Sequence, residues 1–437
     1  MAISVSALLA ACSVAPQRPA PVMAPRPTET ATPPALPSTP DTAVAASAVP
    51  EPSPWMRMRA RFEMPGCEYS AEVMRWAQQY TRSPQRFAAS WKPALPFLLL
   101  VLDEIERRKL PGEFALLPYV ESHYRPLDAK GNLPAGMWQL MPVTARERGL
   151  RIDRDYDGRL DAIDATRAAL ELIERYDREF GDWRLATMAF NAGEFRVKRQ
   201  LAGRSGDSLD AAALARLDLN AITHDHLERM LALACIVAHP ERFDVDLPLP
   251  ERVDHLVAHP LDGSIDLRVA ARVAGLPVDA LRRLNAGHRD LRTAAGAPAR
   301  LLLPEPHVDA LVEATAAHPR LLQAQWRTST VKRTVGIDEL ASASTLDARA
   351  LALANGVAAD ATIAAGTEVL VAASADRATP APAATSTSIA QHVVQAGDTL
   401  SAIARRYRVR VSELLGWNAL RAKSTLRLGM RLRVSGP

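Results

Sequence analysis

The stretch Phe114-Ala115-Leu116-Leu117-Pro118-Tyr119-Val120-Glu121-Ser122 places a carboxylate on an apolar helix. Apolar surroundings favour the protonated form of a carboxylic acid, because its charged form loses solvation there. A protonated carboxyl can give its proton to a leaving-group oxygen, which is the first requirement for cleaving a glycosidic bond. Alone, a glutamate at the end of an amphipathic helix is most often a solvated or capping residue. Glu121 therefore becomes a candidate acid only if other motifs accompany it.

Two further motifs follow in order. Gly136-Met137-Trp138-Gln139-Leu140-Met141-Pro142 begins fourteen positions after Ser122, and Ala189-Phe190-Asn191-Ala192-Gly193-Glu194 comes later. With the Glu-Ser pair, this series resembles the lytic transglycosylase domain of the soluble lytic transglycosylase and goose-lysozyme group. The flanking sequence is most similar to the membrane-bound lytic transglycosylase D type. The resemblance runs from about Trp55 to about Phe243.

The resemblance implies an all-α, lysozyme-like catalytic domain over residues 55–245. The apolar spacing agrees, since Asp164 to Tyr176 and Leu227 to Ala238 both fit amphipathic helices. The implied enzyme is a lyase of peptidoglycan that cleaves the MurNAc-β-1,4-GlcNAc bond and leaves 1,6-anhydro-MurNAc ends. Glu121 would act first as the acid and then as the base, so no second carboxylate is required. Two alternatives stay open: a hydrolytic muramidase on the same fold, and a non-catalytic peptidoglycan-binding protein.

Supporting roles also follow from the resemblance. The residues expected to bind substrate beside the catalytic Glu121 are Ser122, Gly136, Trp138, Gln139, Phe190, Asn191 and His226. Trp138 could equally belong to the core. Three positions depart from the usual pattern: Phe190 replaces a tyrosine, Phe195 replaces a glycine, and His226 occupies the slot of a tyrosine. These changes leave open the alternative that the protein is a weak or inactive enzyme. No Cys or His spacing indicates a metal site, and no cofactor is expected.

The N-terminus resembles a bacterial lipobox. Residues 1–12 end in Leu9-Ala10-Ala11-Cys12, and Cys12 would be cut free and lipidated. No Lys or Arg precedes Cys12, unlike an ordinary secretory signal, so a plain terminus with a chance cysteine is the alternative. Residues 13–54 are rich in Pro, Ala, Thr and Ser and are expected to form an extended, disordered tether. Ser13 after Cys12 favours sorting to the outer membrane.

The C-terminal part contains three repeats. Residues 391–435 strongly resemble a LysM module, a small β-α-α-β domain that binds glycans containing N-acetylglucosamine. Its expected glycan-binding residues are Gly397, Asp398, Thr399, Leu400 and Asn418. Weaker copies are predicted at 262–306 and 328–372, and a linker at 373–390. Each copy carries a marker asparagine ahead of its closing strand: Asn285, Asn355 and Asn418.

The whole chain has 437 residues, enough for several domains, and its formal net charge of +4 gives no strong nucleic-acid signal. The expected fold class is α+β multidomain: the all-α domain followed by LysM modules. We expect a monomer on the periplasmic face of the bacterial envelope, with peptidoglycan strands and the membrane as partners and no nucleic acid. Cys67 and Cys235 could pair there or stay free and buried.

Overall fold

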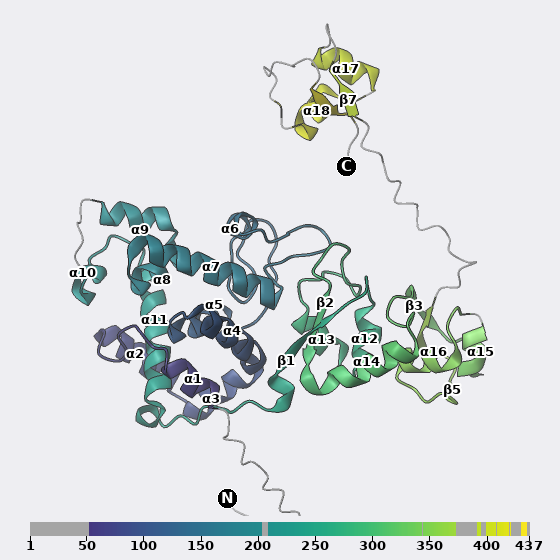
Figure 1. The fold of residues 1–437 in the computed structure, drawn as a ribbon, viewed down its shortest axis with the longest axis horizontal. Coiled ribbons are helices and arrows are strands. Elements are labelled where there is room, and N and C mark those ends of the chain that lie inside the picture. The colour runs from purple at the N-terminus through teal and green to yellow at the C-terminus, as the bar shows by residue number, and fades with distance from the viewer. Residues whose placement is uncertain are drawn as a thin grey trace, which may run out of the picture. The chain divides into compact units, whose positions relative to one another are not determined.

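The computed structural model describes residues 52–202, 209–342, 344–372, 391–394, 399–407, 409–418, 420 and 430–434. Cys12, Gly397 and Asp398, to which the sequence analysis gives roles, lie outside these residues. Figure 1 shows a helical part followed by small strand-and-helix modules. Within the described ranges, no helix combines the length and the apolar character needed to cross a membrane.

The first part is helical, as the sequence predicts. Its only β-pairings among residues 52–202 and 209–250 are isolated bridges. Its helices are α1 (Pro54–Arg59), α2 (Ala71–Tyr80), α3 (Pro84–Trp91), α4 (Leu95–Arg108), α5 (Leu117–Ser122), α6 (Pro142–Glu147), α7 (Ala162–Phe180), α8 (Trp183–Ala192), α9 (Glu194–Leu201), α10 (Ala211–Ala215) and α11 (Ala221–Ala238). Short 3-10 turns are η1 (Lys92–Ala94), η2 (Gly112–Leu116), η3 (Pro240–Phe243) and η4 (Arg252–Asp254).

Helices α4, α7 and α11 organise this part. The side chain of Asp161 caps α7 by accepting from the N–H groups of Ile163 and Asp164, and Gly181 ends the helix in the left-handed conformation. Helix α11 contacts α2 and α8, and every residue from Met230 to Val237 on it is buried (Figure 1). A helix that is apolar on all sides belongs in the interior, so α11 forms the centre of the core.

Three strand-helix-helix-strand modules follow, which confirms the predicted fold class. The first pairs β1 (Leu256–Pro260) antiparallel with β2 (Arg300–Pro304) around α12 (Leu267–Val273) and α13 (Val278–Leu284); η5 (Glu305–His307) and α14 (Val308–Ala317) come next. The second pairs β3 (Trp326–Thr330) with β6 (Glu368–Ala372) and β4 (Val335–Gly336) with β5 (Thr362–Ile363), with α15 (Ile337–Ser342) and α16 (Ala348–Asn355) between. The third pairs β7 (Gln391–Val393) with β8 (Arg431–Arg433) around α17 (Leu400–Arg406) and α18 (Val411–Trp417). The first module begins at Leu256, ahead of residue 262.

The marker asparagines have the same geometry in all three modules. Each Oδ1 accepts from a backbone N–H of the closing strand: Leu302 to Asn285 at 2.8 Å, Leu370 to Asn355 at 2.7 Å and Arg433 to Asn418 at 2.7 Å. Each Nδ2 donates to the carbonyl of that strand residue and to a carbonyl four positions earlier on the second helix. We call this the asparagine clasp. It assigns Asn418 a structural role in place of the expected glycan-binding one, because its amide joins helix to strand.

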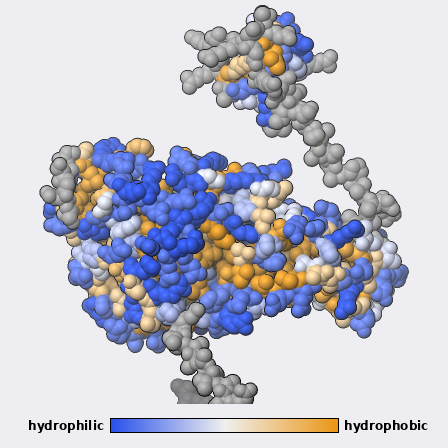
Figure 2. Space-filling view, viewed as in Figure 1, coloured by the Kyte–Doolittle hydropathy of each residue, from blue (hydrophilic) through white to orange (hydrophobic). Residues whose placement is uncertain are grey.

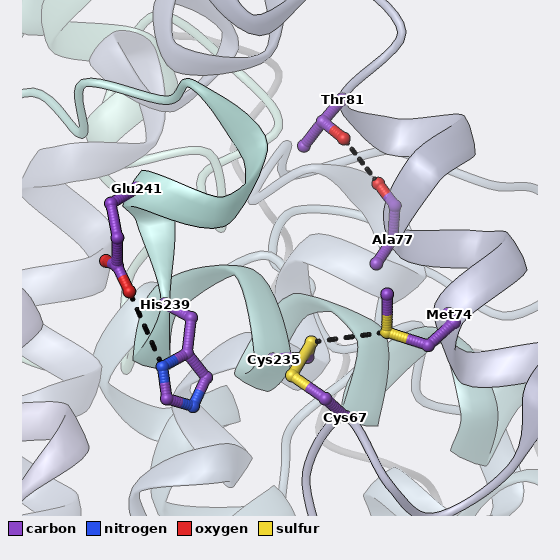
Figure 3. The surroundings of a disulfide bond; sticks show 7 residues. All are labelled: Cys67, Met74, Ala77, Thr81, Cys235, His239 and Glu241. Carbon is purple, nitrogen blue, oxygen red and sulfur yellow. Dashed lines mark hydrogen bonds and ion pairs between the residues drawn. A yellow bond between two sulfur atoms is a disulfide. The ribbon is translucent and has the colours of Figure 1, made fainter.

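A disulfide joins Cys67, in the loop before α2, to Cys235 on α11 (Figure 3). The two residues are 168 positions apart in the sequence. Sequence alone left open whether these cysteines pair, because nothing in it fixes the distance between them. The bond ties the first loop of the helical part to its central helix.

On the face shown in Figure 2, the helical part is mostly hydrophilic, whereas hydrophobic residues gather over the region of the first two modules. Part of the apolar interior is shared. Leu284 and Leu302 of the first module belong to the same buried cluster as the core of α4 and α11. The first module is therefore packed onto the helical part through apolar contacts.

Candidate active site

Glu121 lies in the last turn of α5, which continues from η2. The neighbours Tyr119 and Val120 are buried, and the Tyr119 ring stacks on Trp91 with 4.0 Å between ring centroids. The helix ends at His123, whose φ of 53° lies in the left-handed region. The Glu121 side chain keeps 15% exposure. The sequence prediction of a carboxyl on an apolar helix is confirmed, and the group still reaches the surface.

Ser122 holds the end of α5 against the Gly136–Met141 loop. Its Oγ donates to the carbonyl oxygens of Met137, at 2.9 Å, and Pro118, at 3.3 Å. The residue is 2% exposed. Because the hydroxyl is buried and bonded inside the protein, Ser122 positions the acid and does not meet the substrate. The substrate-binding role expected for it is corrected to this one.

In the loop after Ser122, the structure shows why a glycine stands at position 136 and a tryptophan at position 138. Gly136 has a φ of +81°, and a Cβ there would lie 1.8 Å from the carbonyl oxygen of Arg159. The close approach that demands glycine is therefore to the protein backbone and not to a sugar. Trp138 is fully buried, and its indole N–H donates to Thr166 Oγ1 on α7 at 3.1 Å. Trp138 is a core residue beneath the site.

His226, on α11, contacts the candidate acid directly. Its Nε2 lies 2.8 Å from Oε1 of Glu121, and its side chain is 7% exposed. Its Nδ1 is buried and finds no partner within the described part of the chain. A buried N–H group without an acceptor is rarer in proteins than a buried acceptor atom without a donor. We therefore place the ring proton on Nε2, which donates to Glu121, and leave Nδ1 as the unprotonated nitrogen. The role in substrate binding that the sequence analysis expects for His226 stays a prediction.

A groove of about 590 Å³ is lined by the end of the Gly136–Met141 loop and by the junction of α8 and α9, and Asn191 connects it through Thr223 to the helix that carries His226. The residues that line it are Gln139, Leu140, Met141, Thr144, Leu172, Tyr176, Phe190, Asn191, Ala192, Gly193, Phe195, Arg196 and Arg199. It thus contains three of the predicted substrate-binding residues, together with Phe195, which is 77% exposed. Glu121 and His226 do not line it. Among the described residues, the lining includes two arginines and no carboxylate.

Gln139 and Asn191 present amides at the groove. The Gln139 side chain donates from Nε2 to the Gly136 carbonyl at 2.7 Å, which leaves its Oε1 as an acceptor. Asn191 Oδ1 accepts from Thr223 Oγ1 at 2.8 Å. Thr223 stands three positions before His226 on α11, so both occupy one face of that helix. Thr223 links the groove to the acid, and sequence reasoning missed it.

Two other residues of the site escaped the sequence reasoning. Arg159 and Asp157 form a fully buried ion pair directly behind Gly136, with 2.7 Å between Nη2 and Oδ2. The only available signal was the Asp-Gly-Arg order, which does not distinguish a solvated loop from a buried one.

In the last module, Thr399 caps α17 by accepting from the N–H of Ala402 at 3.2 Å. Leu400 begins that helix. A capping threonine is a structural feature shared by many helices. The roles predicted for Thr399 and Leu400 in glycan binding stay predictions.

Comparisons with known proteins agree with this architecture. The Transglycosylase SLT domain matches residues 104–211, the LysM-like domain of lytic transglycosylase MltD matches 255–320, and the LysM domain matches 392–435. The first match includes Glu121 and Asn191 but not His226.

Whole proteins are also similar. The chain is 29% identical over 391 residues to the membrane-bound lytic murein transglycosylase D of Escherichia coli strains K12 and O6:H1, covering 89% of this chain and 74% of the relatives. An inactive variant of the lytic transglycosylase Slt from Pseudomonas aeruginosa shares 18% identity over 41% of this chain and 30% of its own, with a TM-score of 0.27, too low to bear on the fold. The chain therefore combines an SLT domain with LysM-type domains and is similar over most of its length to a membrane-bound lytic murein transglycosylase D, which supports an enzyme of the lytic transglycosylase type.

Proposed function

We propose that this lytic transglycosylase cleaves the β-1,4 bond between MurNAc and GlcNAc in peptidoglycan and leaves 1,6-anhydro-MurNAc ends. The observation that carries the proposal is the setting of Glu121. Glu121 is held by His226 at 2.8 Å, and the groove that Asn191 connects to α11 through Thr223 has, among the described residues, amides and arginines but no Asp or Glu in its lining. This arrangement supports a mechanism in which one group performs both proton transfers.

The reaction follows from that geometry. The Nε2–H group of His226 donates to Oε1 of Glu121. The other carboxyl oxygen, Oε2, makes no hydrogen bond within the described part of the chain. In the proposed reaction, Oε2 therefore carries the proton that is transferred to the substrate. Glu121 protonates the bridging oxygen, the C–O bond to the anomeric carbon breaks, and GlcNAc leaves as the alcohol. The resulting carboxylate then takes the proton of the MurNAc C6 hydroxyl, whose oxygen bonds to the anomeric carbon. Glu121 ends protonated, and no water is consumed.

The amides of Gln139 and Asn191 suit the sugar. Each side chain offers a donor and an acceptor, which match hydroxyl and N-acetyl groups. The Phe190 ring lies 6.3 Å from the Trp138 ring and adds an apolar wall to the groove. We assign these three residues to substrate binding.

A hydrolytic muramidase would use a second carboxylate about 5 to 9.5 Å from the acid to activate water or the sugar. The described residues that line the groove provide none. A lining of amides and arginines suits ring closure by the C6 hydroxyl, which needs no second carboxylate.

The test is digestion of purified peptidoglycan followed by mass spectrometry of the products. Wild-type protein should release 1,6-anhydro-MurNAc ends, and Glu121→Gln should lower the rate by roughly 100- to 10,000-fold, the usual contribution of a general acid and base. Products with reducing ends alone would overturn the transglycosylase chemistry. Equal inertness of both proteins, with binding retained, would show a glycan-binding protein instead.

Location at the envelope is part of the proposal. The Cys67–Cys235 disulfide supports it, because such bonds persist in oxidising compartments such as the bacterial periplasm. We assign the lipid anchor to Cys12 and the tether to residues 13–54, and we place the protein at the outer membrane as a monomer that the LysM module directs to peptidoglycan. Labelling with a radioactive fatty acid should mark the wild type and not Cys12→Ala.

A further inference from the structure

A buried ion pair lies behind the catalytic loop, which we define as residues 133–141. The Arg159 guanidinium donates from Nε to Asp157 Oδ1 at 3.0 Å and from Nη2 to Oδ2 at 2.7 Å. The side chains of Asp157 and Arg159 are 0% and 2% exposed. The same guanidinium donates from Nη1 to the carbonyls of Leu133, at 2.8 Å, and Leu140, at 3.3 Å. One side chain therefore fixes both ends of the catalytic loop.

The first LysM-like module supplies a second arginine to this pair. Arg289, in the loop between α13 and β2, donates from Nη2 to Asp157 Oδ2 at 2.7 Å. Its Nη1 lies 3.2 Å from the carboxylate of Asp128. A carboxylate without solvent exposure is stabilised only through its partners, so Asp157 depends on both guanidinium groups.

Backbone bonds hold the two loops together. The N–H of Asp157 donates to the Gly287 carbonyl at 2.9 Å, and the N–H of Arg289 donates to the Asp155 carbonyl at 3.1 Å. A Cβ on Gly287 would lie 2.8 Å from the Tyr156 ring. The α13–β2 loop of the module is thus packed directly on the loop that contains Asp157.

The catalytic loop leads from there to the acid. Ser122 donates to the Met137 carbonyl, and Gln139 folds back on the Gly136 carbonyl. Gly136 itself touches the backbone of Arg159. A continuous set of bonds therefore runs from Arg289 through Asp157, Arg159 and the catalytic loop to the residue beside Glu121.

We propose that the first LysM-like module is a working part of the active site, in which Arg289 positions the catalytic loop through Asp157 and Arg159. The inference rests on the proposed function for its catalytic consequence. It makes Arg289 a positioning residue, since it acts through other residues and does not touch the reacting atoms.

The kinetic test uses the full-length chain with peptidoglycan as substrate. Arg289→Ala should lower kcat by roughly 2- to 30-fold, the range found for coupling through packed networks, and leave KM nearly unchanged. Arg289→Lys keeps one charged donor and should recover part of the rate. Arg282→Ala, an exposed arginine of α13, is the matched control and should behave like the wild type. A rate for Arg289→Ala equal to that control would overturn the proposal.

Hydrogen exchange gives a readout that does not depend on catalysis. In Arg289→Ala, peptides covering residues 133–141 should exchange faster, whereas peptides of the distant helix α2 should not change. Unchanged exchange in the catalytic loop would overturn the positioning role. If Arg289→Ala does not fold, Arg289→Lys decides by the same two measurements. Should the wild type release no anhydro ends, the proposed function fails while the exchange experiment still tests the positioning.

Discussion

The carboxyl of Glu121 and the imidazole of His226 act as one unit. The imidazole Nε2–H donates to Oε1 and restrains the carboxyl, and in the proposed reaction Oε2 exchanges the proton with the sugar. Its Nδ1 has no partner among the described residues, and a second proton there would be buried without an acceptor. His226 is therefore suited to hold the Glu121 carboxyl through Nε2.

His226→Phe removes this donor and keeps an aromatic ring of similar size. A hydrogen bond to a charged group contributes about 1.5–3 kcal/mol, so kcat should fall roughly 10- to 150-fold as the carboxylate intermediate loses its partner. Single-turnover digestion of peptidoglycan measures the effect. His226→Tyr restores a hydroxyl donor and should retain more activity than His226→Phe. Equal rates for the two variants would show that the hydrogen bond contributes nothing.

A second carboxyl, that of Glu113 in η2, is fully buried. Its Oε1 accepts from the N–H groups of Glu63, at 2.9 Å, and Met64, at 2.7 Å. Its Oε2 has no partner within the described residues. Burial raises the pKa of Glu113 from 4.5 to about 7. The group supports the loop before α2 and is unsuited to chemistry in the groove.

This raised pKa makes stability depend on pH. Between pH 4.5 and 7 the folded protein holds a proton on Glu113 that the unfolded chain releases, so the free energy of unfolding falls as pH rises through this window. The loss attributable to Glu113 approaches roughly 3 kcal/mol. Glu113→Gln imitates the protonated form and should remove this share of the slope. Urea unfolding at several pH values compares the two proteins, and identical slopes would contradict the assignment.

At the scale of elements, the catalytic loop depends on one close backbone approach. Gly136 combines a φ of +81° with a Cβ position 1.8 Å from the Arg159 carbonyl. Gly136→Ala should therefore cost about 2–5 kcal/mol, the sum of left-handed strain and a forced backbone shift. Gly131→Ala is the control, because Gly131 has a φ of +67° and open space around its Cβ position. It should cost only about 1–2 kcal/mol. Urea unfolding measures both, and equal losses would show that the close approach is unimportant.

The helices and strands were predicted from the sequence better than the tertiary contacts between them. The helices around Glu121 and the three strand-helix-helix-strand modules follow from periodicity and from the marker asparagines. The asparagine clasp explains why the marker asparagines can be recognised in the sequence. In each of the three modules, the same bonds join the second helix to the closing strand. Ser122, Gly136 and Trp138 were expected to bind substrate, but the partners that the structure shows for them are internal. A motif specifies which residue is needed, and only the fold reveals whether it faces the substrate or the backbone.

The connections of the whole molecule join residues that are far apart in the sequence. Arg289 reaches Asp157 across 132 positions, and Arg300 reaches Asp161 across 139. Neither pairing has a local pattern, because each contact depends on how a module packs on a separate set of helices. The first LysM-like module shares a core with the helical part. The sequence analysis predicted it only as a weaker copy of a LysM module that follows the catalytic domain.

The disulfide acts at this same scale. Cys235 lies on α11, nine positions after His226, and its bond to Cys67 ties that central helix to the loop that precedes α2. Cross-linking residues 168 positions apart restricts the unfolded chain strongly. Removing both cysteines, as Cys67→Ala with Cys235→Ala, should lower the free energy of unfolding by about 2–5 kcal/mol. Urea unfolding with and without a reductant measures the change.

The reductant supplies the internal control. It should shift the unfolding midpoint of the wild type toward that of the double variant and leave the variant itself unchanged. A wild-type midpoint that does not respond, while free-thiol labelling shows both sulfurs reduced, would mean that packing alone holds α11 in place. Because α11 also carries Thr223 and His226, a loosened helix should reduce activity as well as stability. We therefore expect the reduced protein to lose glycan cleavage at a lower temperature than the oxidised protein, in step with its unfolding.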